Sequence, residues 1–158
     1  MRIGIISDTH GYLPPQVFSI FKDADYIFHA GDIGDAGIIS ELEIVCPVFA
    51  VYGNIDTYPI TNRYPRLLVQ DIDSKIFYLV HDIVNVRLHR YELFKKNIKP
   101  DIVIYGHSHK PGYQVYQNVL YLNPGSASLP KGKDKGTVAI LNTDKNQLEP
   151  EFIKIDKK

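Results

Sequence analysis

Short apolar runs that end in small polar clusters recur along this chain, and they constrain its fold more than any other feature. Runs rich in Ile, Val, Phe and Tyr occupy residues 2–7, 26–30, 48–52 and 101–105. Their length and composition are typical of buried, mostly parallel strands. Segments with helical periodicity lie between strands, at 15–22, 37–44 and 89–98. The first half therefore predicts strand, helix, strand, helix, strand, joined by right-handed crossovers.

The rest of the chain shows a different pattern, in which strand-like segments follow one another with short gaps. Segments 66–71 and 75–81 flank a turn at Asp73-Ser74. Further segments, whose spacing predicts hairpins and a meander, lie at 113–116, 119–123, 137–142 and 147–155. A parallel half combined with antiparallel strands predicts an α/β fold of two packed sheets covered by helices. The length fits a single domain spanning residues 1–158.

Charge and hydropathy exclude several classes of function. The chain has 18 basic residues (Lys and Arg) and 18 acidic residues (Asp and Glu), so its net charge is zero. Without a net positive charge to attract the phosphate backbone, a nucleic acid is not an expected partner. The longest apolar runs, 48–52 and 76–80, are far shorter than the roughly 20 residues that span a bilayer. The apolar run at residues 2–7 is followed directly by Asp8 and is too short for a secretory signal. We therefore expect a cytoplasmic protein without a membrane segment. The single cysteine, Cys46, excludes an intramolecular disulfide and a Cys-rich zinc site.

Polar side chains cluster where the expected strands end. Carboxyl ends of strands in an α/β sheet form the crevice where ligands bind, so these side chains are expected to converge. The clusters are Asp8-x-His10, Gly31-Asp32, Gly53-Asn54, His81 and His107-x-His109. Together they would gather two Asp, one Asn and four His in one pocket.

This combination of side chains predicts a metal site. Carboxylate, amide and imidazole suit divalent Mn, Fe, Co, Ni or Zn. Seven side chains are too many for one ion with an open position, but they serve two ions if a carboxylate bridges them, and Asp32 is the candidate for the bridge. Each cluster alone has a simpler interpretation: Asp8 as a helix cap, Gly-Asp and Gly-Asn as turns, and His81 as a hydrogen-bonded core residue. Their joint order at strand ends favours the metal site.

The motifs D-x-H, G-D, G-N, a strand-end His and G-H-S-H resemble, in this order, the signature of the calcineurin-like metallophosphoesterases. That signature reads D-x-H, G-D, G-N-H-(D/E), H and G-H-x-H, and the resemblance spans almost the whole chain. The short length and the segment Asn123-Pro124-Gly125-Ser126 resemble the compact single-domain phosphodiesterase branch of bacteria and archaea. A eukaryotic relative of that branch is the small subunit of the retromer coat.

The resemblance implies a four-layer α-β-β-α sandwich and a binuclear site. One metal would be held by Asp8, His10, Asp32 and His109, and the second by Asp32, Asn54, His81 and His107. The implied cofactors are two divalent ions, Mn²⁺ first, with Ni²⁺, Fe²⁺, Co²⁺ and Zn²⁺ as alternatives. The implied reaction is in-line attack on phosphorus by a metal-bridging hydroxide, with Asp32, Asn54 and His81 as catalytic residues. The expected substrate is a small phosphorylated molecule, and a phosphodiester is preferred over a monoester. The resemblance also implies a possible homodimer, because dimers are common in the branch.

The chain departs from the signature at two positions. Ile55 replaces the His that protonates the leaving group in larger members, which predicts a rate loss or a need for a good leaving group. Asp56 matches the acidic position and is expected to orient a neighbouring ligand. Asp82 replaces a glycine beside the metals, and it either disfavours a phosphate by its charge or points to solvent. Outside the signature, His29 is expected to be a hydrogen-bonded core group.

Two classes of function follow from these residues. The first is a metal-dependent phosphoesterase, for which all seven expected ligands are present. The alternative is a catalytically weak, metal-binding interaction module of the retromer-subunit type, which also lacks the acid His. A nuclease is disfavoured by the zero net charge.

Overall fold

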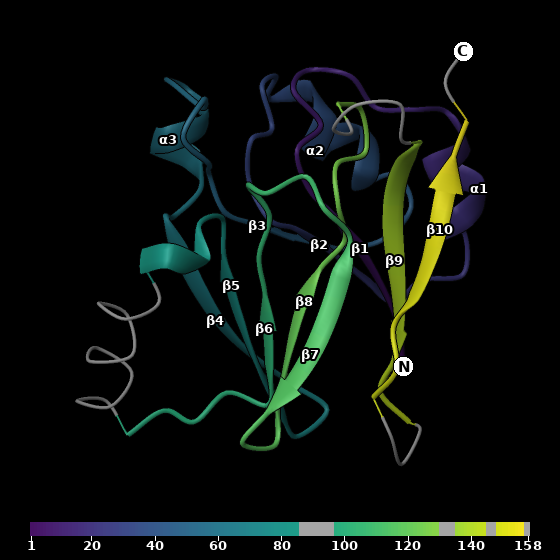
Figure 1. The fold of residues 1–158 in the computed structure, drawn as a ribbon. Helices are drawn as coiled ribbons and strands as arrows, with labels where there is room; N and C mark the ends of the chain where they lie inside the picture. Colours follow the sequence, from purple (N-terminus) through teal and green to yellow (C-terminus); the bar gives the residue numbers. More distant parts are fainter. Residues whose placement is uncertain (86–96, 130–134, 145–147, 157–158) are drawn as a thin grey trace.

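A computed structural model describes residues 1–85, 97–129, 135–144 and 148–156 (Figure 1). The strands form two sheets, as the sequence predicts, and each sheet has five strands. The first sheet has the order β10-β9-β1-β2-β3, and the second has the order β4-β5-β6-β8-β7. None of the helices in these residues is both long and apolar enough to span a bilayer.

The first sheet contains the expected parallel unit. Strands β1 (Arg2–Ile6), β2 (Tyr26–His29) and β3 (Val48–Ala50) pair in parallel. Helices α1 (Gln16–Phe21) and α2 (Gly37–Leu42) form the two crossovers. Strands β9 (Gly136–Asn142) and β10 (Glu151–Ile155) extend the sheet antiparallel on the other side of β1.

The second sheet combines two hairpins with a parallel centre. Strands β4 (Leu67–Ile72) and β5 (Lys75–Val80) form the expected hairpin. Strand β6 (Ile102–Ile104) lies between β5 and β8 (Val119–Asn123) and is parallel to both. Strand β7 (Gly112–Tyr116) closes the sheet as an antiparallel partner of β8.

The expected meander is wrong in one respect, because its strands divide between the two sheets. Strands β7 and β8 belong to the second sheet, whereas β9 and β10 belong to the first. The segment between β8 and β9 crosses from one sheet to the other, so these consecutive strands do not pair. Periodicity gives strand positions but carries no information about which sheet a strand joins.

Two short helical turns were not expected from the sequence. They are α3 (Ile60–Arg63), which lies above β4 and β5 in Figure 1, and the 3₁₀ turn η1 (Ile83–Asn85). Both are too short to show an amphipathic repeat. The helix expected at 89–98 lies almost entirely outside the described residues, and so does the fourth layer that it would supply.

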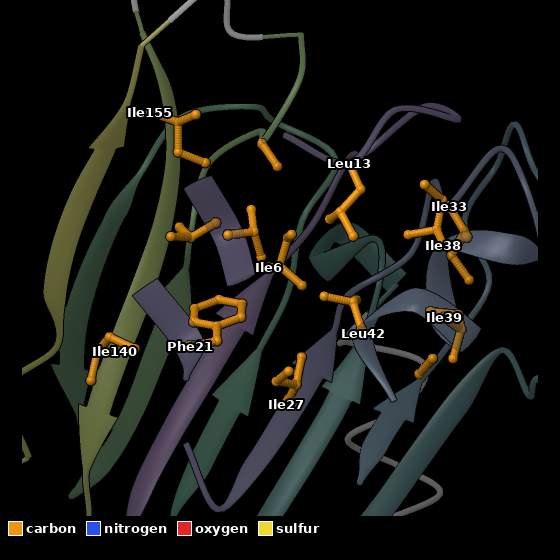
Figure 2. Close-up of a cluster of buried hydrophobic side chains, with 14 of the residues drawn as sticks. Ile6, Leu13, Phe21, Ile27, Ile33, Ile38, Ile39, Leu42, Ile140 and Ile155 are labelled. Atoms are coloured by element: carbon orange, nitrogen blue, oxygen red, sulfur yellow. The ribbon is translucent and has the colours of Figure 1, made fainter. Parts of the chain in front are cut away.

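Alternating residues of the strands fill three buried clusters, of which the smallest, on the second sheet, contains Tyr78, Val80, Val103 and Val119. Ile6 and Ile27 pack against Phe21, Ile39 and Leu42 of the helices, as Figure 2 shows. The other face of the same sheet packs against the second sheet through residues that include Ile3, Ile5, Phe28, Phe77, Leu79 and Ile104. The rings of Phe28 and Phe77 stack with centroids 5.0 Å apart and join the two sheets. This packing brings the carboxyl ends of both parallel units to the same edge of the molecule.

Candidate metal centre

All seven expected ligand side chains lie together at the seam between the sheets. Asp8, His10, Asp32 and Asn54 follow strands of the first sheet, and His81, His107 and His109 follow strands of the second. The two sides meet directly, because His81 Nδ1 donates a hydrogen bond to the carbonyl of Ala30 at 2.8 Å.

Four of these side chains form the first group, consisting of Asp8, His10, Asp32 and His109. One ligand atom of each lies within 4.8 Å of the others. His109 Nε2 is 3.2 Å from Asp8 Oδ1 and 3.4 Å from His10 Nε2. His10 Nε2 is 3.9 Å from Asp32 Oδ2. The spacing leaves room for one ion among nitrogen and oxygen atoms.

The second group contains Asp32, Asn54, His81 and His107. Asn54 Oδ1 is 3.0 Å from His81 Nε2 and 2.9 Å from His107 Nδ1. His81 Nε2 is 3.3 Å from Asp32 Oδ1. Asp32 therefore lies between the groups, with Oδ2 toward His10 and Oδ1 toward His81. The grouping coincides with the one that the family signature implies, while the role of each side chain as a ligand stays a prediction.

The donor chemistry of the site fits cations. His81 Nδ1 donates to a carbonyl, so in the neutral ring Nε2 has a lone pair that faces the oxygens of Asp32 and Asn54. His109 has the same arrangement, since Nδ1 donates to the Leu129 carbonyl at 2.6 Å and leaves Nε2 facing Asp8. Lone pairs that face one another repel unless a proton or a metal ion lies among them. Backbone carbonyls that fix histidine tautomers in this way are typical of metal sites.

Asp8 gives independent support for a cation. Its side chain is fully buried, and neither carboxylate oxygen accepts a hydrogen bond within the described part of the chain. Burial raises the pKa of this carboxyl. An ionised buried carboxylate without a hydrogen-bonding partner is costly, and a bound divalent ion would compensate that cost.

Asp32 and His81 shift each other's pKa. Burial raises the pKa of Asp32, but hydrogen bonds from His81 and from the backbone N–H of Ile55 outweigh burial and leave the pKa below its usual value. Burial lowers the pKa of His81, but the adjacent Asp32 outweighs burial and leaves that pKa above its usual value. Each group therefore favours the charged form of the other.

Five of the seven residues have a positive backbone dihedral angle φ. The residues are Asp8 (φ 55°), His10 (48°), Asp32 (53°), His107 (66°) and His109 (58°). The left-handed region is uncommon for residues other than glycine, and it persists only where surrounding contacts enforce it. These loops are therefore held in a strained form that turns the ligand atoms toward the seam.

Asp56 supports the loop that carries Asp32 and the turn before Asn54. Its carboxylate accepts hydrogen bonds from the backbone N–H groups of Ile33 (3.0 Å), Gly34 (2.7 Å) and Gly53 (2.8 Å). The first two belong to the loop that carries Asp32, and the third precedes Asn54. Asp56 therefore positions both ligands through their backbones.

The expectation that His29 is a hydrogen-bonded core group agrees with its surroundings. Its Nδ1 accepts from the Gly31 N–H at 3.2 Å, so Nε2 carries the proton and donates to Thr9 Oγ1 at 2.9 Å. The Thr9 hydroxyl in turn donates to the carbonyl of Ile33. This chain of bonds connects the loops after β1 and β2 beneath the site.

Gly53 and Gly106 allow the loops to approach one another closely. A Cβ on Gly53 would overlap the backbone N and the carboxylate of Asp32. A Cβ on Gly106 would overlap the Ser7 hydroxyl and lie 2.9 Å from Asp8 Oδ2. Any side chain at these positions would displace predicted ligands.

Asn123, at the end of β8, and the segment that follows it support the site. In the sequence, this segment is notable only because it resembles the compact phosphodiesterase branch. Asn123 Nδ2 donates to the carbonyl of Gly106 at 2.7 Å, and Ser126 Oγ donates to the carbonyl of Asp8 at 2.9 Å. Ser128 Oγ donates to the carbonyl of Thr9 at 2.7 Å. Because β8 is parallel to β6, Asn123 reaches the same edge, and recognition of that parallel pairing would have identified it.

A pocket of about 270 Å³ opens beside the second group. It is lined by Tyr52, Gly53, Asn54, Arg66, Val80, His81, Asp82 and His107. Asp82 is therefore on the pocket wall, and its Oδ1 also accepts from the Val84 N–H at 2.8 Å. Nothing in the sequence indicated Arg66, because no motif contains it.

Comparison with known proteins agrees with the geometry. Residues 1–146 match the family model described as the calcineurin-like phosphoesterase superfamily domain. A probable metallophosphoesterase of Methanothermobacter thermautotrophicus is 36% identical over 162 residues, which cover 98% of this chain and 92% of that protein. The structure of an archaeal phosphodiesterase superimposes with a TM-score of 0.77 at 29% identity and covers 97% of this chain and 100% of its own. Vps29 of Chaetomium thermophilum, at 14% identity, has the same fold, with a TM-score of 0.74 and coverage of 98% and 97%.

Proposed function

The chain belongs to the calcineurin-like phosphoesterase superfamily, and from that premise we propose that it is a two-metal phosphodiesterase acting on small phosphorylated substrates. The observation that carries the proposal is the position of Asp32. Its two carboxylate oxygens face different groups of histidines, as a carboxylate shared by two ions would.

The residues present fit two divalent ions with mixed oxygen and nitrogen ligands. Mn²⁺ is the first candidate, and Fe²⁺, Co²⁺, Ni²⁺ and Zn²⁺ suit the same ligands. Asp8, His10, Asp32 and His109 would hold one ion, and Asp32, Asn54, His81 and His107 would hold the other. When bound, the ions lower the pKa of a water molecule and offset negative charge on the phosphate.

The chain itself contributes positioning. Asp32 spaces the two groups, and the carbonyls of Ala30 and Leu129 fix the rings of His81 and His109. Asn54 turns Oδ1 toward the two histidines, which leaves its Nδ2 group to donate a hydrogen bond to a phosphate oxygen. No covalent nucleophile from the chain is required.

The leaving group must depart without a proton from residue 55. The side chain of Ile55 is 43% exposed beside Asn54, and it carries no exchangeable proton. General acids contribute about 10²- to 10⁴-fold in rate. We therefore propose that substrates have leaving groups stable as anions, or that solvent protonates them.

Hydrolysis of bis(4-nitrophenyl) phosphate by protein purified without chelator tests the proposal. With excess Mn²⁺ we expect hydrolysis that EDTA abolishes and that falls by about 10³-fold or more in Asp32→Ala. Asp35→Ala is the matched control, because Asp35 is an exposed carboxylate on the same loop. Metal binding without hydrolysis by the wild-type protein would contradict a phosphodiesterase.

One observation favours the interaction module as a second candidate. Large apolar side chains on loops next to the site are exposed, namely Ile55 (43%), Tyr58 (81%) and Val84 (79%). Exposed apolar surface is typical of contacts with other proteins. Metal binding without hydrolysis would favour this candidate.

A further inference from the structure

Arg66 lies on the wall of the pocket beside the second group, outside every motif of the family signature. We propose that Arg66 forms a subsite for a second anionic group, a carboxylate or phosphate, on one arm of the substrate. The inference rests on the proposed phosphodiesterase function, because it defines which diesters that site prefers. It makes Arg66 a specificity-determining residue that binds substrate away from the scissile bond.

The pocket connects Arg66 to the proposed centre. Arg66 and Tyr52 line it together with Asn54, His81 and His107. The backbone N–H of Tyr52 donates to the carbonyl of Pro65 at 3.1 Å. This bond fixes the start of β4 against the end of β3 and so holds Arg66 at the pocket. A volume of about 270 Å³ suits a small substituent of a phosphate ester.

The Arg66 guanidinium is available to a ligand. Within the described residues, no side chain or backbone group forms an ion pair or hydrogen bond with it. A guanidinium presents a planar fork of donors that matches a carboxylate or a phosphate in bidentate fashion. The scissile phosphate of a diester carries one negative charge, which the proposed metal pair already offsets. This additional cation in the pocket lining therefore fits a second anion better than it fits the scissile group.

A matched pair of diesters tests the subsite. The substrates are 4-nitrophenyl phenyl phosphate and 4-nitrophenyl 4-carboxyphenyl phosphate, which share the nitrophenolate leaving group and differ in one carboxylate. We expect Arg66→Gln to raise KM for the carboxylated diester roughly 10-fold and to leave its kcat unchanged. Both KM and kcat for the uncharged diester should stay the same. Arg63→Gln is the matched control, because Arg63 is an exposed arginine at the end of α3 that does not line the pocket.

A binding measurement separates this inference from the proposed function. Phenylphosphonate and 4-carboxyphenylphosphonate have C–P bonds that no phosphodiesterase hydrolyses, and calorimetric titration of the Mn²⁺-loaded protein gives both affinities. We expect the carboxylated ligand to bind more tightly to the wild-type protein and to lose that advantage in Arg66→Gln. An advantage in binding without any hydrolysis would overturn the proposed function and retain the subsite. Hydrolysis with equal effects of Arg66→Gln on both members of each pair would overturn the subsite alone.

Discussion

Asp56 shows how a single carboxylate outside the ligand set can determine the geometry of the site. It is 7% exposed, and its two oxygens accept three backbone N–H groups from the loops that carry Asp32 and Asn54. Hydrogen bonds to a charged group contribute about 1.5–3 kcal/mol each, more than those between neutral groups. The stability of the loops and the position of two predicted ligands therefore depend on the same side chain.

We predict that Asp56→Asn lowers the free energy of unfolding by about 3 kcal/mol and weakens Mn²⁺ binding at least about 10-fold. The amide NH₂ would face backbone N–H donors that now meet a carboxylate oxygen. Urea unfolding of the metal-free protein and a calorimetric Mn²⁺ titration measure the two effects. Asp35→Asn is the control, because the exposed Asp35 carboxylate accepts only from the nearby Gly37 N–H among the described contacts, and a change within about 0.5 kcal/mol is expected. Equal effects of both substitutions would contradict the role of Asp56.

The buried ring of His29 predicts how stability depends on pH. Burial lowers the pKa of His29 to about 3, below the ordinary value of 6.5. Between these values the unfolded chain binds a proton that the folded protein does not, so this contribution to stability is lost as the pH falls below about 6.5. One such group contributes a slope of at most about 1.4 kcal/mol per pH unit.

Urea unfolding of the metal-free protein between about pH 7.5 and 5 measures this slope. In His29→Asn we expect a shallower decline of the unfolding free energy with falling pH. The Asn Oδ1 can still accept from the Gly31 N–H, but the amide does not titrate. An unchanged slope in the variant would refute the contribution of His29.

At the scale of elements, the loops after the parallel strands combine backbone strain with close approach. Their positive φ values at predicted ligands and the close approach at Gly53 occur together. We predict that Gly53→Ala lowers the unfolding free energy by about 1–3 kcal/mol, because the methyl group would displace Asp32. The same variant should lose most Mn²⁺-dependent hydrolysis.

Gly112 supplies the matched control for the effect of Gly53. It begins β7, and a Cβ there would meet nothing within 4 Å. Gly112→Ala should therefore change the unfolding free energy by less than about 0.5 kcal/mol and leave hydrolysis intact. Thermal or urea unfolding of both variants compares them directly, and a similar loss in both would contradict the close approach at Gly53.

The sequence predicted most elements because the strands are apolar and end at distinct polar residues. Runs around Ile3, Phe28 and Ile104 fall within strands of the structure, and the polar residues after them lie at one edge. The division of the later strands between two sheets depends on packing between distant segments, which local patterns do not encode. The place of Arg66 could not be predicted for a related reason, since its pocket forms only when β4 lies beside the end of β3.

At the scale of the whole molecule, the site joins the two sheets. The first sheet supplies Asp8, His10, Asp32 and Asn54, and the second supplies His81, His107 and His109. Metal ions bound to ligands from both sheets would act as cross-links between them. Ions that bind the folded protein and not the unfolded chain would raise its stability by mass action.

We predict that Mn²⁺ at about 100 times its Kd raises the unfolding free energy by about 2.7 kcal/mol. For a chain of this size the midpoint of thermal unfolding should rise by roughly 5–10 °C. Thermal scans with Mn²⁺, with EDTA and with EDTA followed by excess Mn²⁺ measure the shift and its reversal. Asp32→Ala should show no shift, and a shift of equal size in that variant would place the stabilising ion elsewhere.

The supports that Asp8 and Thr9 receive from Ser126 and Ser128 also have a consequence for protein synthesis. These contacts join the first strand's loop to residues made more than a hundred positions later. Strand β9, which pairs with β1, is made later still. A nascent chain on the ribosome therefore cannot assemble the site while it is only partly made. Under the proposed function, ions would therefore bind a site whose supports are complete only after residues 126–142 have emerged, and would not guide early folding.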